Sequence, residues 1–288
     1  MMAEAASGRV TVREALRLAN LVLREAQVET PRLDAEVLLA HHLGITRSHL
    51  LARLGFALEP EMEDGYQALV ERRSLHEPVA YIIGYKEFYG LKIQVDRRVP
   101  IPRPETEILV EVALASAKQG KSPVVEVGTG SGAVAVALAV NLPQVEVYAT
   151  DLSPPALEVA GENCRRHKVL ERIFLLEGDL LEPLSEPVVL VVANLPYLSR
   201  QELEGTPPEV AKYEPRRAFD GGLNGLDHYR RLFAQAPSHL LPGANICLEV
   251  GANQAQAINR IARERFPQAK VAVIKDLAGL DRVLFITT

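Results

Sequence analysis

The stretch Val124-Val-Glu-Val-Gly-Thr-Gly-Ser-Gly-Ala133 joins a hydrophobic run to a loop with glycine at every second position. VVEV has the β-branched composition of a buried strand, and the apolar AVAVALAVN that follows it is predicted to be helical. Glycines between a strand and a helix let the backbone turn sharply and let a ligand approach it closely. Such a loop is typical of a nucleotide-type site at the carboxyl end of a parallel strand.

The alternation of strand and helix continues toward the end of the chain. Further strands are predicted at residues 145–151, 173–179, 188–194 and 245–251. This order predicts parallel βαβ units and a doubly wound α/β sheet. VAVIKDL and RVLFITT follow each other too closely for a parallel crossover, so one strand of that pair must be antiparallel. We expect a Rossmann-like, seven-stranded sheet with one reversed strand at its end.

Residues 1–77 are predicted to form a small helical domain. VTVREALRLANLVLREA spaces its apolar residues at intervals of three and four, and Thr11 suits an N-cap. TPRLDAEVLLAHHLG and EPEMEDGYQALVERRSL supply two more helical patterns. We find no strand pattern that interrupts this region.

The residue composition and pattern change in the next two parts of the chain. Residues 78–100 have β-branched and aromatic residues around Gly84 and Gly90, which predicts a β-hairpin linker. Residues 101–288 contain the alternating pattern and are predicted to be the main domain. It opens with a proline-rich loop that turns into a helix near Pro104.

Composition limits the classes of protein that fit. The 288 residues carry a formal net charge of −5, which does not favour a strongly basic nucleic-acid binder. The two cysteines lack the spacing of a disulfide framework or zinc site, so no metal is expected. We recognise neither a secretory signal nor a run of about 18 apolar residues, so a cytoplasmic protein without membrane contact is expected.

Polar residues at strand ends extend the glycine loop into a candidate site. Asp151 ends the second strand, where its carboxylate can take both hydroxyls of a ribose. Asp179 ends the third strand and can address the amino group of an adenine. The cofactor-binding candidates are Glu126, Gly128, Thr129, Gly130, Ser131, Gly132, Asp151, Leu152, Asp179, Leu180 and Asn194.

The spacing of the loop narrows the choice of cofactor. GxGxG differs from the GxGxxG of dinucleotide sites, and Glu126 would suit a cation better than a pyrophosphate. Two other interpretations are a nicotinamide or flavin site and a plain tight turn in which Glu126 caps loop N–H groups. The E-x-G-x-G-x-G pattern resembles motif I of class I S-adenosylmethionine methyltransferases, whose cofactor carries a sulfonium and an ammonium group.

The stretch Val192-Ala-Asn-Leu-Pro-Tyr-Leu198 ends the fourth predicted strand. N-x-P-Y resembles the (Asn/Asp)-Pro-Pro-(Tyr/Phe) motif of amino-methyltransferases, which methylate planar, conjugated nitrogens. Asn194 and the Leu195 carbonyl can each accept one N–H of such a group, and Pro196 favours an extended conformation at Leu195. Tyr197 offers a flat face for stacking. A simple strand-terminating turn is the alternative.

The resemblance assigns roles to this stretch. It implies catalytic roles for Asn194, Pro196 and Tyr197 and substrate contacts for the same three residues and Leu195. Holding the nitrogen in line with the methyl group supplies much of the catalysis, and we identify no acid–base pair in the sequence. Leu195 stands where proline is usual, and N-L-P-Y also resembles ribosomal-RNA adenine dimethyltransferases. The motif therefore leaves a protein glutamine and an adenine base as substrates.

Further motifs carry a more specific resemblance. PRLDAEVLLAHHLG, PVAYIIGYKEFYGLKIQVD, IPRPETEILVE and YEPRRAFDGGLNGLDHYRR look like the HemK/PrmC family, and the resemblance runs from about residue 10 to 288. It implies methylation of the glutamine N5 in the GGQ motif of class I peptide chain release factors, which modulates translation termination. It further implies S-adenosyl-L-methionine as cofactor, S-adenosyl-L-homocysteine as product, and recognition of the release factor by the N-terminal helical domain.

Several alternatives and assignments stay open from sequence. An adenine N6-methyltransferase acting on RNA or DNA, a nicotinamide oxidoreductase and a noncatalytic cofactor-binding partner protein each fit part of the pattern. For the favoured function we expect a monomer without direct nucleic-acid contact. Arg103 and Glu105 either shape the cofactor pocket or form an interdomain ion pair, and residues 213–222 either close over the substrate loop or form a structured surface loop.

Overall fold

The computed structural model describes residues 9–117 and 123–288. The first eight residues of the predicted helical domain, and Ser122 at the predicted start of the alternating pattern, lie outside the described residues. The chain divides into two compact units, Met1–Gly84 and Tyr85–Thr288. Each unit is described by itself.

The first unit is helical. Its helices are α1 (Val12–Glu25), α2 (Pro31–His42), α3 (Arg47–Leu51), α4 (Pro60–Ser74) and α5 (Val79–Ile83). The three predicted helical segments are confirmed as α1, α2 and α4. Thr11 caps α1, because its hydroxyl accepts a hydrogen bond from the Glu14 N–H at 3.3 Å. Buried Leu23, Leu38 and Leu39 belong to the core that these helices share.

Helix α5 corrects the prediction for residues 78–100. The apolar run Val79–Ile83 is a short helix between Pro78 and Gly84, and Gly84 ends it with a φ of 80°. A short apolar run fits helix and strand equally well, so its β-branched residues were a poor guide. The predicted hairpin follows it, as β1 (Tyr85–Phe88) paired antiparallel with β2 (Leu91–Gln94).

The second unit contains a seven-stranded sheet with the order β5-β4-β3-β6-β7-β9-β8. Its strands are β3 (Val124–Val127), β4 (Val147–Asp151), β5 (Ile173–Glu177), β6 (Val188–Ala193), β7 (Leu240–Glu249), β8 (Lys270–Lys275) and β9 (Asp281–Thr287). Strands β3 to β7 run parallel, and β9 runs antiparallel to both β7 and β8. The predicted seven-stranded sheet with one reversed strand is therefore confirmed.

The sequence predicted the reversed strand at the end of the sheet. The structure places it one position in from the sheet edge. β9 carries the buried residues Val283, Leu284 and Ile286, whereas β8 is mostly exposed or half-buried. β9 takes the interior position, where both of its faces are covered. β8 forms the edge and carries a lysine at each end, a common feature of edge strands.

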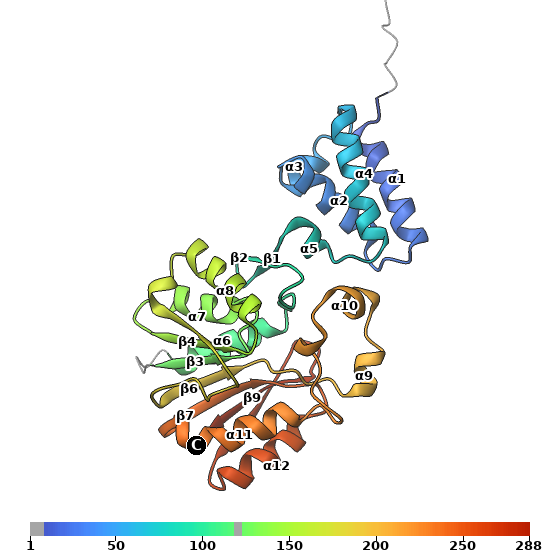
Figure 1. The fold of residues 1–288 in the computed structure, drawn as a ribbon. Helices are drawn as coiled ribbons and strands as arrows, with labels where there is room; N and C mark the ends of the chain where they lie inside the picture. The colour runs from blue at the N-terminus through green and yellow to red at the C-terminus, as the bar shows by residue number, and fades with distance from the viewer. Residues whose placement is uncertain (1–8, 118–122) are drawn as a thin grey trace, which may run out of the picture. The chain divides into compact units, whose positions relative to one another are not determined.

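Helices cover both faces of this sheet, with α11 and α12 on one face and α6, α7 and α8 on the other (Figure 1). The bounds are α6 (Thr106–Ala117), α7 (Ala133–Asn141), α8 (Pro154–Arg166), α11 (Asp227–His239) and α12 (Ala255–Arg265). Shorter elements are η1 (Leu170–Arg172), α9 (Arg200–Glu204), α10 (Pro208–Tyr213) and η2 (Arg216–Ala218). Among the described residues, no helix is both long and apolar enough to cross a membrane.

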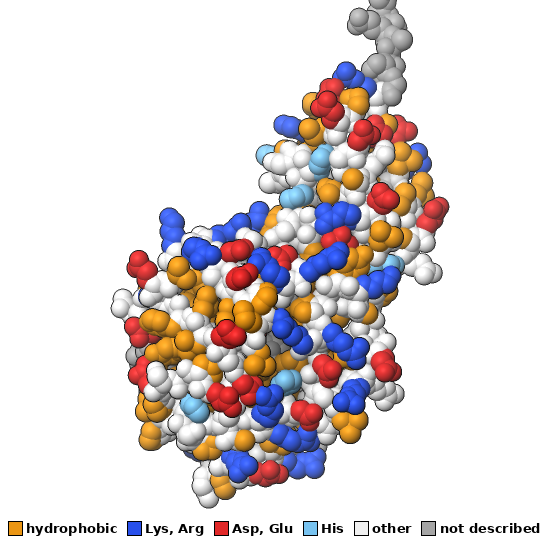
Figure 2. Space-filling model, viewed as in Figure 1, with side chains coloured by type: hydrophobic (Ala, Val, Ile, Leu, Met, Phe, Trp, Pro, Cys, Tyr) orange, Lys and Arg blue, Asp and Glu red, His pale blue; other side chains and the backbone are white. Residues whose placement is uncertain are grey.

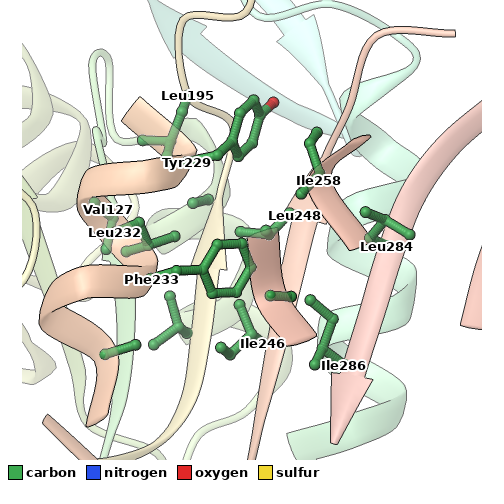
Figure 3. Close-up of a cluster of buried hydrophobic side chains, with 14 of the residues drawn as sticks. Val127, Leu195, Tyr229, Leu232, Phe233, Ile246, Leu248, Ile258, Leu284 and Ile286 are labelled. Atoms are coloured by element: carbon green, nitrogen blue, oxygen red, sulfur yellow. The ribbon is translucent and has the colours of Figure 1, made fainter. Parts of the chain in front are cut away.

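The core beneath α11 and α12 anchors the strand ends. Tyr229 and Phe233 of α11 pack with Leu248 of β7 and with Val127, the last residue of β3 (Figure 3). The Tyr229 hydroxyl donates a hydrogen bond to the Glu249 carbonyl at 2.8 Å, so its buried polar group has a partner. Because β3 and β7 end against the same cluster, the loops that follow them start from fixed positions.

The order of the strands fixes where a ligand site can form. From β3 the chain continues to β4 on one side and returns later to β6 on the other side. This is the topological switch point of the sheet, and ligands bind outside the carboxyl ends of the strands there. Val127 pairs with Ala193, so the residues that follow them, Gly128 and Asn194, meet at that edge.

Candidate active site

The glycine loop is held at the switch point by its own backbone. The N–H groups of Gly128 and Thr129 donate to the Thr150 carbonyl at 2.8 and 2.9 Å. Gly132 is the N-cap of α7 with a φ of +76°, and a Cβ there would lie 3.0 Å from the Ala160 Cβ. Glycine is therefore needed at this position both for its backbone angle and for the packing of α7 on α8.

Asp151 joins the loop to the end of β4. Its carboxylate accepts hydrogen bonds from the Gly130 N–H at 2.8 Å and from the Ser153 N–H at 2.9 Å. Burial raises the pKa of Asp151, and these hydrogen bonds with the nearby Arg217 act against that rise. A carboxylate has about four acceptor positions, so this geometry leaves room for ligand hydroxyls.

A cavity of about 370 Å³ opens beside Asp151. Predicted residues that line it are Gly128, Gly130, Asp151, Leu152, Leu180, Asn194, Leu195 and Pro196. Polar residues of the lining that the sequence reasoning missed are Arg98, Ser153 and His228. Arg217 and Asp220 of the lining come from the segment 213–222 that the sequence singled out. The volume suits a small-molecule site, and its mixture of apolar walls and few polar groups is typical of cofactor pockets.

Asp179 has a different placement from its neighbours Gly178 and Leu180, which line the larger cavity. Its Oδ2 forms an ion pair with Arg231 of α11, and Gln235 donates to the same oxygen at 3.4 Å. Within the described residues, Oδ1 is buried without a hydrogen-bond partner. Asp179 is therefore tied to α11, and its contact with an adenine amino group stays a prediction.

Glu126 has the capping role that was the alternative to a cofactor contact. Its Oε2 accepts hydrogen bonds from the Thr129 hydroxyl and, at 2.8 Å, from the Ala135 N–H in the first turn of α7. Burial raises the pKa of Glu126 to about 8, and these two hydrogen bonds oppose the rise. Glu126 also lines a second cavity, so the two roles are compatible.

The second cavity, of about 130 Å³, borders the first. Both are lined by Gly128, Gly130, Asn194 and Leu195. Predicted residues that line only the smaller cavity are Glu126, Thr129, Ser131 and Tyr197. Of the predicted site residues, Gly132 and Asp179 line neither cavity. The glycine loop and the Asn-Leu-Pro-Tyr loop thus form one continuous site with a larger and a smaller compartment.

Leu195 is fixed by packing. It is buried at 2% exposure within the cluster beneath α11, near Tyr229 (Figure 3). Its Cδ2 would lie 3.6 Å from a Cβ at Gly128, so it also supports the first glycine of the loop. Leucine lacks the ring that fixes the φ of a proline at this position. Burial provides a restraint that the sequence alone did not reveal.

The segment after α10 holds the Asn-Leu-Pro-Tyr loop from the outside. The Leu198 N–H donates to the Phe219 carbonyl at 3.0 Å, and the Gly221 N–H donates to the Leu198 carbonyl at 2.8 Å. A Cβ at Gly221 would lie 2.8 Å from the Pro196 carbonyl oxygen. Phe219 and Gly221 therefore lie directly against the Asn-Leu-Pro-Tyr loop, and closure of residues 213–222 over the substrate loop stays a prediction.

Arg103 and Glu214 connect two of the quoted sequence motifs. Arg103 pairs with buried Glu214 at 2.5 Å, and Glu214 also accepts a hydrogen bond from the Ile101 N–H at 2.9 Å. All three residues belong to the second unit, so this ion pair of Arg103 lies within one unit. Arg103 lines the smaller cavity, which supports the expectation that it shapes the pocket.

Sequence reasoning missed two polar residues of the smaller cavity, Thr106 and Glu249. Glu249 ends β7, so the rule that singled out Asp151 and Asn194 at strand ends would have found it. It is 2% exposed, and burial raises its pKa to about 7. Thr106 begins α6 and accepts a hydrogen bond from Asn194 Nδ2 at 3.1 Å. Asn194 and the titratable Glu249 therefore line the same cavity.

Relatives of known name decide the family. The chain is 42% identical over 275 residues to the release factor glutamine methyltransferase of Moorella thermoacetica, covering 95% of this chain and 97% of the relative. The protein of the same name from Geobacter sulfurreducens is 41% identical, with 95% of both chains covered. The chain belongs to the release factor glutamine methyltransferase family. The HemK/PrmC resemblance is thereby confirmed.

Two family models match separate parts of this family member. The PrmC N-terminal domain model matches residues 14–84, and the ribosomal protein L11 methyltransferase (PrmA) model matches residues 104–197. A methyltransferase structure from Pyrococcus furiosus has a TM-score of 0.51 at 20% identity and covers 77% of this chain and 96% of its own. That likeness shows the methyltransferase fold alone.

Proposed function

We propose that this protein transfers a methyl group from S-adenosylmethionine to the side-chain nitrogen N5 of the glutamine in the GGQ motif of class I release factors. The observation that carries the proposal is the meeting of Gly128 and Asn194 at the switch point, between two connected cavities. The larger cavity has the size of a cofactor site, and the smaller one has the amide, carbonyl and aromatic groups that suit a planar amide. Family membership supports the same reaction.

The residues of the larger cavity fit the cofactor. Asp151 would hold the ribose hydroxyls, and Leu152 and Leu180 give the same cavity apolar walls that suit the adenine ring. Glu126 and Glu249 line the smaller compartment and supply negative charge when ionised, which favours a sulfonium or ammonium group nearby. When bound, the cofactor supplies an electrophilic methyl group.

The residues of the smaller cavity fit the substrate amide. An amide nitrogen is a poor nucleophile because its lone pair is delocalised into the carbonyl. Asn194 Oδ1 and the Leu195 carbonyl would accept its two N–H groups, while Tyr197 would stack on its plane. Fixing the nitrogen in this way lowers the entropic part of the barrier, since no search of orientations is needed. The product S-adenosyl-L-homocysteine would leave through the larger cavity.

An adenine substrate is less well supported by the charge distribution. Acidic and basic side chains are interspersed on the face that Figure 2 shows. Together with a net charge of −5, this mixture differs from the basic stripe typical of proteins that track a phosphate backbone. Binding to RNA or DNA would also be strongly salt-dependent. A release-factor protein is therefore the substrate that we propose.

The helical unit is proposed to recognise the release factor outside its GGQ loop. Helix α1 exposes Leu18, Leu21 and Val22, each more than 40% accessible. Leu18 and Val22 line a groove with residues of α4, including Gln67. Exposed apolar groups of this kind are common at protein-binding surfaces. Leu18→Lys should raise the KM for the release factor and leave kcat nearly unchanged, and an unchanged KM would contradict this role for α1.

A methyl-transfer assay tests the function. The protein would be incubated with labelled S-adenosylmethionine and, in parallel, a class I release factor, its Gly-Gly-Ala variant, or ribosomal RNA. We expect label on the native release factor and none on the other two. Label on RNA, with none on either protein, would mean that the Asn-Leu-Pro-Tyr loop receives an adenine.

A further inference from the structure

The side-chain amide of Asn194, proposed above as catalytic, has a polar partner on the side away from the substrate. Asn194 Nδ2 donates a hydrogen bond to the hydroxyl oxygen of Thr106 at 3.1 Å. Thr106 is 4% exposed and is the first residue of α6, so its position is fixed by a long buried helix. This contact joins the end of β6 to α6, from a distant part of the chain.

Glu249 lies next to this pair. It ends β7, which neighbours β6 in the sheet, and Leu248 stands opposite Ala193 in the parallel register. Glu249, Thr106 and Asn194 line the same cavity, and the Thr106 hydroxyl and the Asn194 amide both act to lower the pKa of the Glu249 carboxyl. Within the described residues, Glu249 Oε2 is buried without a hydrogen-bond partner. Burying a carboxylate with incomplete hydrogen bonding lowers stability, so a role in the site would account for its presence.

The chemistry of the three groups decides which way the Asn194 amide points. An ionised carboxylate accepts hydrogen bonds only, whereas a hydroxyl has one hydrogen to donate and lone pairs to accept. When Thr106 donates its hydrogen to Glu249, it can only accept from its other neighbour. The Asn194 side chain must then present its NH₂ group to Thr106, which turns Oδ1 the opposite way.

We propose that Glu249 and Thr106 are positioning residues that keep Asn194 Oδ1 directed at the substrate nitrogen. The inference rests on the proposed function, in which Asn194 Oδ1 accepts an N–H of the glutamine amide. An asparagine side chain is nearly symmetric in shape, so packing alone distinguishes its oxygen from its nitrogen poorly. If the Asn194 side chain flipped, its NH₂ group would face the NH₂ group of the substrate amide, and the acceptor that the substrate needs would be lost.

Charge on Glu249 makes this device dependent on pH. Burial raises the pKa of Glu249 to about 7, and Glu105 adds to the rise, while Thr106, Arg282 and Asn194 oppose it. The negative charge of Glu249 also helps to raise the pKa of the Tyr197 and Tyr229 phenols. Protonated Glu249 can donate to Thr106, which frees Thr106 to donate to Asn194 Oδ1. The wrong amide orientation becomes available as the pH falls below about 7.

Three variants separate positioning from simple structural support. Glu249→Gln keeps the shape but can present either an oxygen or an NH₂ group to Thr106. Thr106→Val keeps the volume without a hydroxyl, and Thr106→Ser restores the hydroxyl as a matched control. The measurements are kcat and KM for the release factor from about pH 5.5 to 8.5, together with the Kd for S-adenosylhomocysteine by calorimetry.

The expected result is selective. Glu249→Gln and Thr106→Val should lower kcat by about 10- to 100-fold, the scale seen when groups that orient a contacting side chain are removed. In Thr106→Val, which leaves the charge of Glu249 in place, the Kd for S-adenosylhomocysteine should change by less than roughly 2-fold, well below a tenfold, 1.4 kcal/mol effect. Thr106→Ser should stay close to the unmodified protein. The kcat of the unmodified protein should decrease as the pH falls through about 7. The kcat of Glu249→Gln should not show this decrease.

Other outcomes would overturn the inference. Normal kcat in Glu249→Gln, or a Thr106→Ser variant as impaired as Thr106→Val, would show that the hydroxyl and carboxylate do not orient the amide. Equal losses of kcat and cofactor affinity would indicate a purely structural role. Asn194→Ala is measured in parallel: if it is inactive while Glu249→Gln is normal, the inference fails and the proposed function stands. Full activity of Asn194→Ala would remove the proposed function itself.

Discussion

Gln254 donates a hydrogen bond from Nε2 to the carbonyl oxygen of Tyr197 at 2.8 Å. It thereby ties the residue before α12 to the last residue of the Asn-Leu-Pro-Tyr loop. Gly225 lies beside this contact, and its carbonyl oxygen is 3.5 Å from the same nitrogen. A loop that must hold a substrate to within a fraction of an ångström needs such support from several elements.

Gly225 should tolerate no side chain. A Cβ there would lie 2.2 Å from the Tyr197 carbonyl oxygen, and its φ is +72°. Gly225→Ala should displace the Tyr197 backbone and lower kcat at least tenfold, since small misplacements of a reacting group have such effects. Gly243→Ala is the matched control, with a φ of +73° and open space around the Cβ.

Thermal unfolding and kcat of the two glycine variants give the comparison. Gly243→Ala should lose about 1–2 kcal/mol from its backbone angle alone and keep its activity. Equal effects of the two substitutions on kcat would mean that the contact between Gly225 and Tyr197 does not matter for the site.

Asn194→Ala should nearly abolish methyl transfer and leave much of the cofactor affinity. The substitution removes the acceptor for the substrate N–H, while the glycine loop and Asp151 keep their contacts. Single-turnover rates and calorimetry with S-adenosylhomocysteine would measure the two effects separately. Normal turnover would contradict the idea that the side-chain amide holds the substrate.

Asp151→Ala should weaken cofactor binding by roughly 1.5–3 kcal/mol, the scale of hydrogen bonds to a charged group. Part of this loss would come from the Gly130 N–H, which loses its carboxylate partner. Glu177→Ala is the control, because Glu177 ends the adjacent strand β5 and is exposed. Similar Kd values for Asp151→Ala and Glu177→Ala would show that Asp151 does not hold the ribose.

Stability should fall as the pH rises through neutrality, because burial raises the pKa of Glu249 from 4.5 to about 7. Because the pKa of Glu249 is higher in the folded protein than in the unfolded chain, the folded protein binds this proton more tightly. The stabilisation is complete below pH 4.5, where the unfolded chain is also protonated, and is lost as the pH rises through about 7. The loss is roughly 3 kcal/mol at most, from 1.36 kcal/mol per pKa unit.

Urea denaturation at about pH 5 and pH 8 would test this dependence. Glu249→Gln carries no titrating group at the position, so its free energy of unfolding should decrease less over that interval. Glu126 contributes a decrease of the same sign in both proteins, because burial raises its pKa to about 8. Parallel changes in the two proteins would mean that Glu249 titrates normally.

Local patterns predicted most of the fold. The apolar run at Val188–Ala193 and the glycines after Val127 indicated strands with functional ends, and the structure places both at the switch point. Helix α5 was missed because a five-residue apolar run has no clear period. The interior place of β9 depends on its pairing with both β7 and β8, which a connection length does not reveal.

Long-range contacts explain the limits of the site prediction. Asp179 was assigned to an adenine from its strand end, but its pairing with Arg231 depends on the docking of α11. Thr106 and Glu249 are far from Asn194 in sequence, and only the packing of α6 and β7 brings them together. Local spacing indicates which residues carry chemistry, whereas the groups that orient them come from the tertiary fold.

Peptide mass spectrometry of a methylated release factor tests the central claim most directly. The release factor would be incubated with S-adenosylmethionine and either the unmodified protein or Asn194→Ala, then digested and sequenced by fragmentation. The account predicts one added methyl group on the side chain of the GGQ glutamine with the unmodified protein and almost none with Asn194→Ala. A methyl group on another residue, or equal methylation by the variant, would contradict it.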